Sequence, residues 1–232
     1  MFQRKFSLRV RKIHRYLGLF IGLQFLAWTI SGLYFSWTDI DEIHGDQFLK
    51  PQKEDRYSEL IDLDQIPAEI VSLVLVKVDQ VPYYWINESS LYNAKTGAQK
   101  AEITEAEALS VVKEKVVEEL QVKKIEYVKE TNAHHEYRGR PLPAYAIHFD
   151  HPEELVAYVD AKSGQFQRIR HQSWRWFDFL WMSHTMDYQG RDDFNNVLLR
   201  IFSLFGLFTV LSGFLLWGTS SSIVRTLFKK SK

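Results

Sequence analysis

The sequence contains no cysteine among its 232 residues. A disulfide framework, a thiolate metal site and a cysteine nucleophile are therefore excluded. The common catalytic signatures are also missing, because we find no glycine-rich phosphate loop, no nucleophile elbow and no zinc-protease motif. Ser183, His184 and Asp187 do not indicate a catalytic triad, since they lie on one short segment without an oxyanion hole.

Charged residues are absent from two long stretches. Tyr16–Trp37 is uncharged over 22 residues, which at about 1.5 Å per residue spans about 30 Å of hydrocarbon. It is too long for the apolar core of a signal peptide, and no small-x-small cleavage pattern follows it. Ile201–Trp217 is the second uncharged stretch, and counted from Val197 it is also long enough to cross a bilayer. We predict two transmembrane helices, at 16–37 and 197–218.

Acidic residues are absent from both ends of the chain. Residues 1–15 carry six basic residues, and residues 219–232 carry four. All 29 acidic residues lie between these ends with the other 19 basic residues, so the middle has a net charge of −10. The positive-inside rule therefore predicts a membrane protein with both termini cytoplasmic and the central domain outside, in a periplasm or at an outer surface. Membrane lipid is a sufficient partner for the basic ends, and we expect no nucleic acid.

Small residues recur along one face of each predicted span. On the first span this face holds His14, Gly18, Gly22, Phe25, Thr29 and Gly32. On the second it holds Ser203, Gly206, Thr209 and Gly213. Such faces let another helix or a flat ligand approach the backbone closely. We expect the two stripes either to face one another or to join subunits of a homodimer or hetero-oligomer.

The segment 38–172 is predicted to form an extracytoplasmic α+β domain. We expect a helix at Thr104–Leu120, where Thr104 and Glu107 form a capping box ahead of an apolar face. Runs of β-branched and aromatic residues predict the strands: Val71–Val78, Pro82–Asn87, Ser90–Lys95, Lys124–Lys129, Ala144–Phe149, Leu155–Ala161 and Gln165–Arg170.

One stretch of this domain is repeated. Tyr92–Gly97 (YNAKTG) resembles Tyr158–Gly164 (YVDAKSG). In both, we expect a strand with an exposed tyrosine to run into a turn whose glycine takes a positive φ. The repeat predicts two related β-hairpin units, with the helix before the second.

The segment before the second span is rich in aromatic residues. Trp174–His184 (WRWFDFLWMSH) has the aromatic density that is typical of a membrane–water interface. We predict a short interfacial helix there, inside a connecting segment at 173–196.

Together these features resemble a known family. The central segment is similar to a PepSY domain, with its helix, strands and Tyr-x-Asp-Ala-x-Ser-Gly hairpin. The spans resemble the PepSY-associated transmembrane family, which is seen in iron-regulated membrane proteins and siderophore reductases. The membrane residues that carry the resemblance are His14-Arg-Tyr-Leu-Gly18 with Gly22, Ser31-Gly32, Ser183-His184-Thr185, and Ser212-Gly213 with Trp217. Reductase-like members typically have more spans than the two predicted here.

The resemblance implies haem b held on membrane histidines and electron transfer across the bilayer, with His14 and His184 as candidate ligands. Imidazole is a natural axial ligand of haem iron. His14 is predicted at the cytoplasmic end and His184 at the outer face, so about 30 Å of bilayer separates them. They cannot ligate one haem within one chain. Either they serve two haems, as when each histidine pairs with its own copy in a symmetric dimer, or at most one of them is a ligand.

Other side chains are weaker candidates. His44 lies near the outer end of the first span and is a haem-ligand candidate if it approaches His184; otherwise it is a loop residue. Met182 and Met186 flank His184 and offer a soft ligand, although such methionines more often face lipid. Imidazoles and a carboxylate also gather in the outer segment without diagnostic metal-ligand spacing: His134, His135, His148, Asp150 and His151.

We therefore expect a membrane protein that binds haem b and takes part in transmembrane electron transfer for iron or siderophore reduction or uptake. Two alternatives stay open. One is a cofactor-free, membrane-tethered PepSY module that binds a peptide or inhibits a protease. The other is an accessory subunit of a transporter. Bound haem separates the first function from both alternatives.

Overall fold

The computed structural model describes residues 2–51, 54–117 and 119–221, with side chains from Phe6 onward. The chain divides into two compact units. Met1–Trp37 and Asp178–Lys232 form one, which we call the membrane unit, and Thr38–Phe177 form the other, the central unit. The basic residues predicted to form the C-terminal tail, from Arg225 onward, lie outside the described residues.

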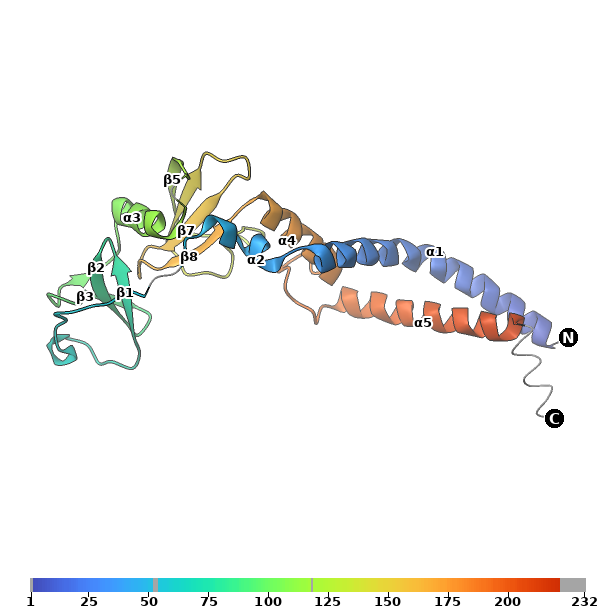
Figure 1. The fold of residues 1–232 in the computed structure, drawn as a ribbon. Coiled ribbons are helices and arrows are strands. Elements are labelled where there is room, and N and C mark those ends of the chain that lie inside the picture. The colour runs from blue at the N-terminus through green and yellow to red at the C-terminus, as the bar shows by residue number, and fades with distance from the viewer. Residues whose placement is uncertain (1, 52–53, 118, 222–232) are drawn as a thin grey trace. The chain divides into compact units, whose positions relative to one another are not determined.

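The membrane unit is built on two long apolar helices, α1 (Phe2–Trp37) and α5 (Val197–Ser220), which lie side by side (Figure 1). Phe6–Trp37 and Val197–Ser220 are long and apolar enough to cross a membrane. Asn196 begins α5, because its side chain accepts a hydrogen bond from the backbone N–H of Leu199 at 2.8 Å. The predicted fold class, two apolar helices flanking an α+β domain, is confirmed.

The two apolar helices pack through small residues, but not along the whole of the predicted stripes. Gly206 receives the ring of Phe25, whose Cζ lies 3.0 Å from where a Cβ would be. Ser203 was expected on this face but is exposed. Ser212 was not expected there, and it is buried. Nothing lies within 4 Å of a Cβ built on Gly18 or Gly22. These two glycines therefore do not receive α5 in this chain.

The membrane unit also contains the second half of α4 (Gln172–Thr185) and the link that joins it to α5. The buried carboxylate of Asp187 accepts hydrogen bonds from the backbone N–H groups of Gly190 and Asp193. Arg191 forms an ion pair with buried Asp178. These contacts hold the polar link in one conformation. The predicted aromatic helix at 174–184 is confirmed as part of α4.

The central unit contains two four-stranded antiparallel sheets separated in sequence by one helix. The first sheet has the order β1 (Leu73–Val78), β2 (Val81–Ile86), β3 (Ser90–Asn93), β4 (Gln99–Lys100). The second has the order β5 (Val122–Val128), β6 (Ala144–Phe149), β7 (Val156–Asp160), β8 (Phe166–Arg170). The helix is α3 (Glu105–Lys115). Short helical turns precede the sheets: α2 (Ile40–His44), η1 (Asp46–Phe48) and η2 (Leu63–Gln65).

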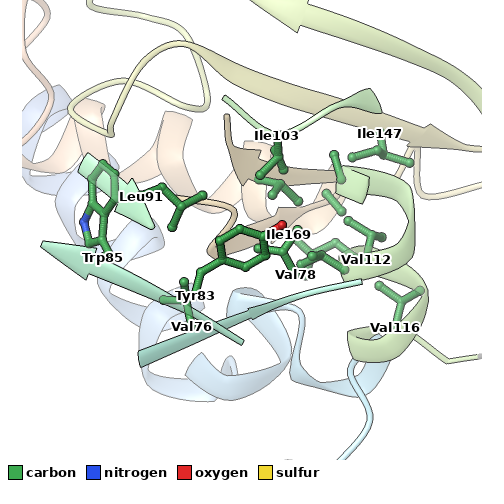
Figure 2. Packing of buried hydrophobic residues seen from close by; sticks show 14 of the residues in the cluster. Val76, Val78, Tyr83, Trp85, Leu91, Ile103, Val112, Val116, Ile147 and Ile169 are labelled. Atoms are coloured by element: carbon green, nitrogen blue, oxygen red, sulfur yellow. The ribbon is translucent and has the colours of Figure 1, made fainter. Parts of the chain in front are cut away.

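One apolar core joins both sheets and α3. Figure 2 shows Val76 and Tyr83 of the first sheet near Ile169 of the second, with Val112 of α3 beside them. Val112 has no exposed surface, and Ile169 has 1%. Burial of this set stabilises the unit, because each large aliphatic side chain removed from water contributes about 1.5–3 kcal/mol.

The helix α3 is shorter than predicted. Its start is as expected, since Thr104 Oγ1 accepts a hydrogen bond from the backbone N–H of Glu107 and the Glu107 carboxylate accepts one from the N–H of Thr104. Its end is at Lys115 rather than Leu120. Val116 takes an extended conformation and pairs with Leu49, a residue far away in the sequence. A local apolar pattern does not reveal such a partner.

The repeated stretch forms matching turns, as predicted. Asn93 and Asp160 each accept hydrogen bonds from the backbone N–H groups that follow them. The turns are completed by Gly97 at φ +74° and Gly164 at φ +71°. The prediction of exposed tyrosines was wrong for Tyr92 (5% exposed) and Tyr158 (2% exposed). Both faces of these strands are covered.

Tyr158 is covered by Glu136 and Tyr137, which lie on an irregular segment. The Tyr158 ring stacks on that of Tyr137 with centroids 4.5 Å apart, and the Tyr158 hydroxyl donates to Glu136 at 2.7 Å. Burial, reinforced by the Glu136 carboxylate, raises the pKa of Tyr158 far above its ordinary value. The phenol therefore stays neutral and donates this hydrogen bond at any physiological pH.

Candidate functional site

His14 of α1 lies against a serine–glycine pair on α5. Its Nδ1 is 2.8 Å from Oγ of Ser212, which is buried. Ser212 Oγ in turn donates to the backbone oxygen of Thr209 at 2.8 Å. A Cβ on the neighbouring Gly213 would lie 3.4 Å from His14 Cε1, so glycine gives the ring room to approach. The Ser212 hydroxyl therefore orients the imidazole, and Gly213 leaves space for it.

His184 of α4 lies against a second serine–glycine pair, on α1. Its Nδ1 is 2.7 Å from Oγ of Ser31, which donates to the backbone oxygen of Ala27 at 2.8 Å. A Cβ on Gly32 would lie 4.0 Å from His184 Cε1. Trp28 strengthens the contact, because its Nε1–H donates to the backbone oxygen of His184 at 2.8 Å.

The two arrangements are the same in chemistry. In each, imidazole Nδ1 meets a serine hydroxyl whose helix is not its own, and the serine is followed by glycine. Within the described part of the chain, Nε2 of neither His14 nor His184 has a hydrogen-bond partner. Neutral imidazole is the commonest protein ligand of transition metals, and it binds through a ring nitrogen whose orientation is fixed from the other side. In both histidines a serine hydroxyl fixes the ring from the Nδ1 side.

The two histidines cannot serve one iron within a chain. Ser31, the partner of His184, follows His14 on α1 by 17 residues, a rise of about 25 Å. The arrangement therefore provides two single-imidazole sites, one towards each end of α1.

An apolar groove adjoins the first of these sites. It has a volume of about 420 Å³ and is lined by Val210, Gly213, Phe214 and Trp217 of α5. Gly213 belongs both to this groove and to the contact with His14. Mostly apolar concave surface is typical of cofactor sites, and here the His14 imidazole lies against one residue of the lining, Gly213.

Aromatic rings surround the second site. The ring of Phe35 meets that of His184 edge-on at 5.6 Å between centroids, and the ring of Trp28 lies at 6.3 Å. Burial lowers the pKa of His184 below its ordinary value. The imidazole is therefore neutral at neutral pH, which is the form that binds metal.

This lowered pKa predicts a pH-dependent stability. Below about pH 6.5 an unfolded chain protonates His184, whereas the folded chain resists protonation, so the free energy of unfolding falls as the pH drops from about 6.5 towards the pKa of the folded state. Thermal unfolding in detergent at pH 7.5 and pH 5.5 measures this loss. We expect His184→Gln to lose less stability between the two pH values than the unmodified protein. Replacing the exposed His44 by Gln is the control and should keep the full loss; an equal loss in both variants would contradict the assignment.

The other predicted candidates are His44, Met182 and Met186. His44 ends α2 in the central unit, where it is exposed, and it belongs to neither histidine–serine pair as described. Met182 is half-buried and Met186 is buried.

Three imidazoles of the predicted cluster in the central unit have separate partners. His148 on β6 contacts Glu126 on β5 at 3.1 Å, and Nδ1 of His135 and of His151 each accept a backbone hydrogen bond. Across the residues that the structure describes, no three His, Cys, Asp or Glu side chains are grouped to hold a metal ion. Their clustering in the sequence is therefore not reproduced in space.

Sequence reasoning did not assign roles to the two serines. Ser31 and Ser212 belong to the motifs that carried the family resemblance, but their contacts with His184 and His14 depend on how the helices align. The available signal was the occurrence of one Ser-Gly pair in each span.

The comparisons with known proteins agree with this architecture. The family model described as "PepSY-associated TM region" (PepSY_TM) matches residues 11–232. Searches of curated proteins and of solved structures found no match. The matched range contains α1 from Arg11 onward, all of α5, the central unit and both histidine–serine pairs. The chain belongs to the PepSY-associated TM region family.

Proposed function

We propose that this membrane protein binds haem b through His14 and His184 and takes part in electron transfer across the bilayer, for iron or siderophore reduction or uptake. The observation that carries the proposal is the pair of imidazoles whose Nδ1 atoms are held by buried serines. Each ring keeps Nε2 for a ligand, as metal-binding histidines do.

The residues around both histidines fit haem. Its iron takes imidazole as an axial ligand, and its flat macrocycle suits the apolar groove beside His14 and the aromatic rings beside His184. When bound, haem supplies one-electron redox chemistry. The chain's own residues orient both imidazoles, and burial favours the neutral form of His184.

Each site offers a single histidine, and a second chain is the proposed source of another ligand. In a symmetric dimer, His14 would pair with its own copy, and His184 likewise. Gly18 and Gly22 leave α1 uncovered by α5 along one stretch, which supports close approach of another helix there. A different subunit in a hetero-oligomer is the alternative source of that ligand.

The proposed location is a bacterial inner membrane with both termini in the cytoplasm. The excess of lysine and arginine at the two ends supports it. The central unit would then lie in the periplasm and dock a substrate or partner. The two sites near opposite ends of α1 would lie towards opposite membrane faces.

An absorption spectrum tests the proposal. The protein is expressed with added haem, purified in mild detergent, and measured oxidised and then reduced with dithionite. We expect a sharp Soret band and, on reduction, the α and β bands of a b-type cytochrome. A featureless spectrum at full protein yield would overturn the electron-transfer function. A cofactor-free PepSY module would then remain, with co-purification of a transporter as the sign of an accessory subunit.

A further inference from the structure

The serine hydroxyl in each histidine–serine pair donates its proton to a backbone oxygen of its own helix. Ser212 Oγ donates to the backbone oxygen of Thr209, and Ser31 Oγ donates to that of Ala27, both at 2.8 Å. A hydroxyl has one proton to donate and two lone pairs that accept. Its remaining contact, with imidazole Nδ1, is therefore one in which Oγ accepts and Nδ1–H donates.

This direction of donation determines the tautomer of both rings. A neutral imidazole protonated at Nδ1 carries its lone pair on Nε2. If the serine instead donated to Nδ1, the proton would sit on Nε2 and the ring could not bind a metal there. The backbone contacts of the two serines favour the metal-binding tautomer at both His14 and His184.

We infer that Ser212 and Ser31 are positioning residues that hold His14 and His184 in the Nδ1-protonated tautomer and so keep Nε2 available as a ligand. The tautomer stands on geometry alone; its effect on haem rests on the proposed function.

The contact is more than helix packing. Several hydroxyls on α1 donate to their own backbone, but Thr29 and Ser36 are exposed and their described bonds stay within the helix. Ser31 and Ser212 are 3% and 8% exposed, and both meet imidazole. A buried serine in a helix contributes little to helix stability by itself, so its burial beside an imidazole is explained by the hydrogen bond it accepts.

Nitrogen-15 NMR of histidine-labelled protein, without haem and at pH 8, tests the tautomer directly. Two rings in the unmodified protein should show protonated Nδ1 and unprotonated Nε2. We expect Ser212→Ala to remove this pattern for His14 alone, and Ser31→Ala to remove it for His184 alone. Replacement by threonine keeps a hydroxyl and should restore it. Unchanged patterns in both alanine variants would overturn the inference.

Haem titration supplies the second readout. Loss of a group that orients a metal-binding histidine typically weakens metal affinity about 10- to 100-fold, and we expect this loss in each alanine variant, with recovery in the threonine variants. Ser36→Ala removes a hydroxyl that bonds only its own helix in the described contacts, and it should leave affinity unchanged. If the unmodified protein and all variants bind no haem but the NMR patterns change as expected, the positioning role stands and the haem proposal fails. If haem binds normally to every alanine variant, the positioning role is wrong.

Discussion

His14→Ala is expected to lower the haem content of the purified protein by about half, and His184→Ala by the other half. The two imidazoles lie about 25 Å apart along α1 and have separate serine partners, so removing one should leave the other site intact. The double variant should contain no haem. The measurement is the haem-to-protein ratio after denaturation in alkaline pyridine.

The exposed His44 provides the matched control for these variants, and His44→Ala should retain all haem. Helical circular dichroism should be unchanged in every variant, because each substitution leaves the helix backbone in place. If either single variant keeps its full haem content, that histidine is not a ligand. If one single variant loses all haem, the two sites are not independent.

Gly164→Ala is expected to destabilise the central unit strongly. Gly164 has φ +71°, a conformation that costs an alanine about 1–2 kcal/mol. Its new Cβ would also overlap Cγ2 of buried Val78 and lie 3.3 Å from Cγ2 of Ile103, and overpacking of a core costs about 1–3 kcal/mol more. The free energy of unfolding should therefore fall by about 2–5 kcal/mol. Urea unfolding of the full-length protein in detergent measures it.

Gly139→Ala separates the two costs. Gly139 has φ +67°, but nothing lies within 4 Å of a Cβ built on it. It should lose only the backbone contribution, about 1–2 kcal/mol. Equal losses at Gly139 and Gly164 would show that the core next to Val78 accommodates the extra methyl group.

Local chemistry was enough to predict much of the fold. The uncharged stretches became α1 and α5 because about 20 apolar residues suffice for a span. The capping box at Thr104 fixed the start of α3, and the repeated Asn/Asp-Ala-Lys-Thr/Ser-Gly stretch formed turns, since both depend only on neighbouring residues.

Contacts between residues far apart in the chain could not be predicted from local sequence patterns. The end of α3 depends on the pairing of Val116 with Leu49. The burial of Tyr158 depends on the stacking of Tyr137, which lies on an irregular segment. The two-residue strand β4 is too short to give a pattern.

The candidate site was predicted in part. His14 and His184 were identified through the family resemblance, and the reason that they are separate was clear from the length of the span. Their serine partners depend on the alignment of α1 with α4 and α5, which spacing within one helix cannot give. His44 was named because it is near the span in sequence, and it lies in the other unit.

Helix α1 carries the imidazole of one pair and the hydroxyl of the other. Sliding α1 along its neighbours by one helical turn, about 5.4 Å, would break both hydrogen bonds together, and so would a rotation that turns this face away. The two histidine–serine pairs are therefore mechanically coupled through α1, and a displacement of the helix imposed at one pair would disturb the other.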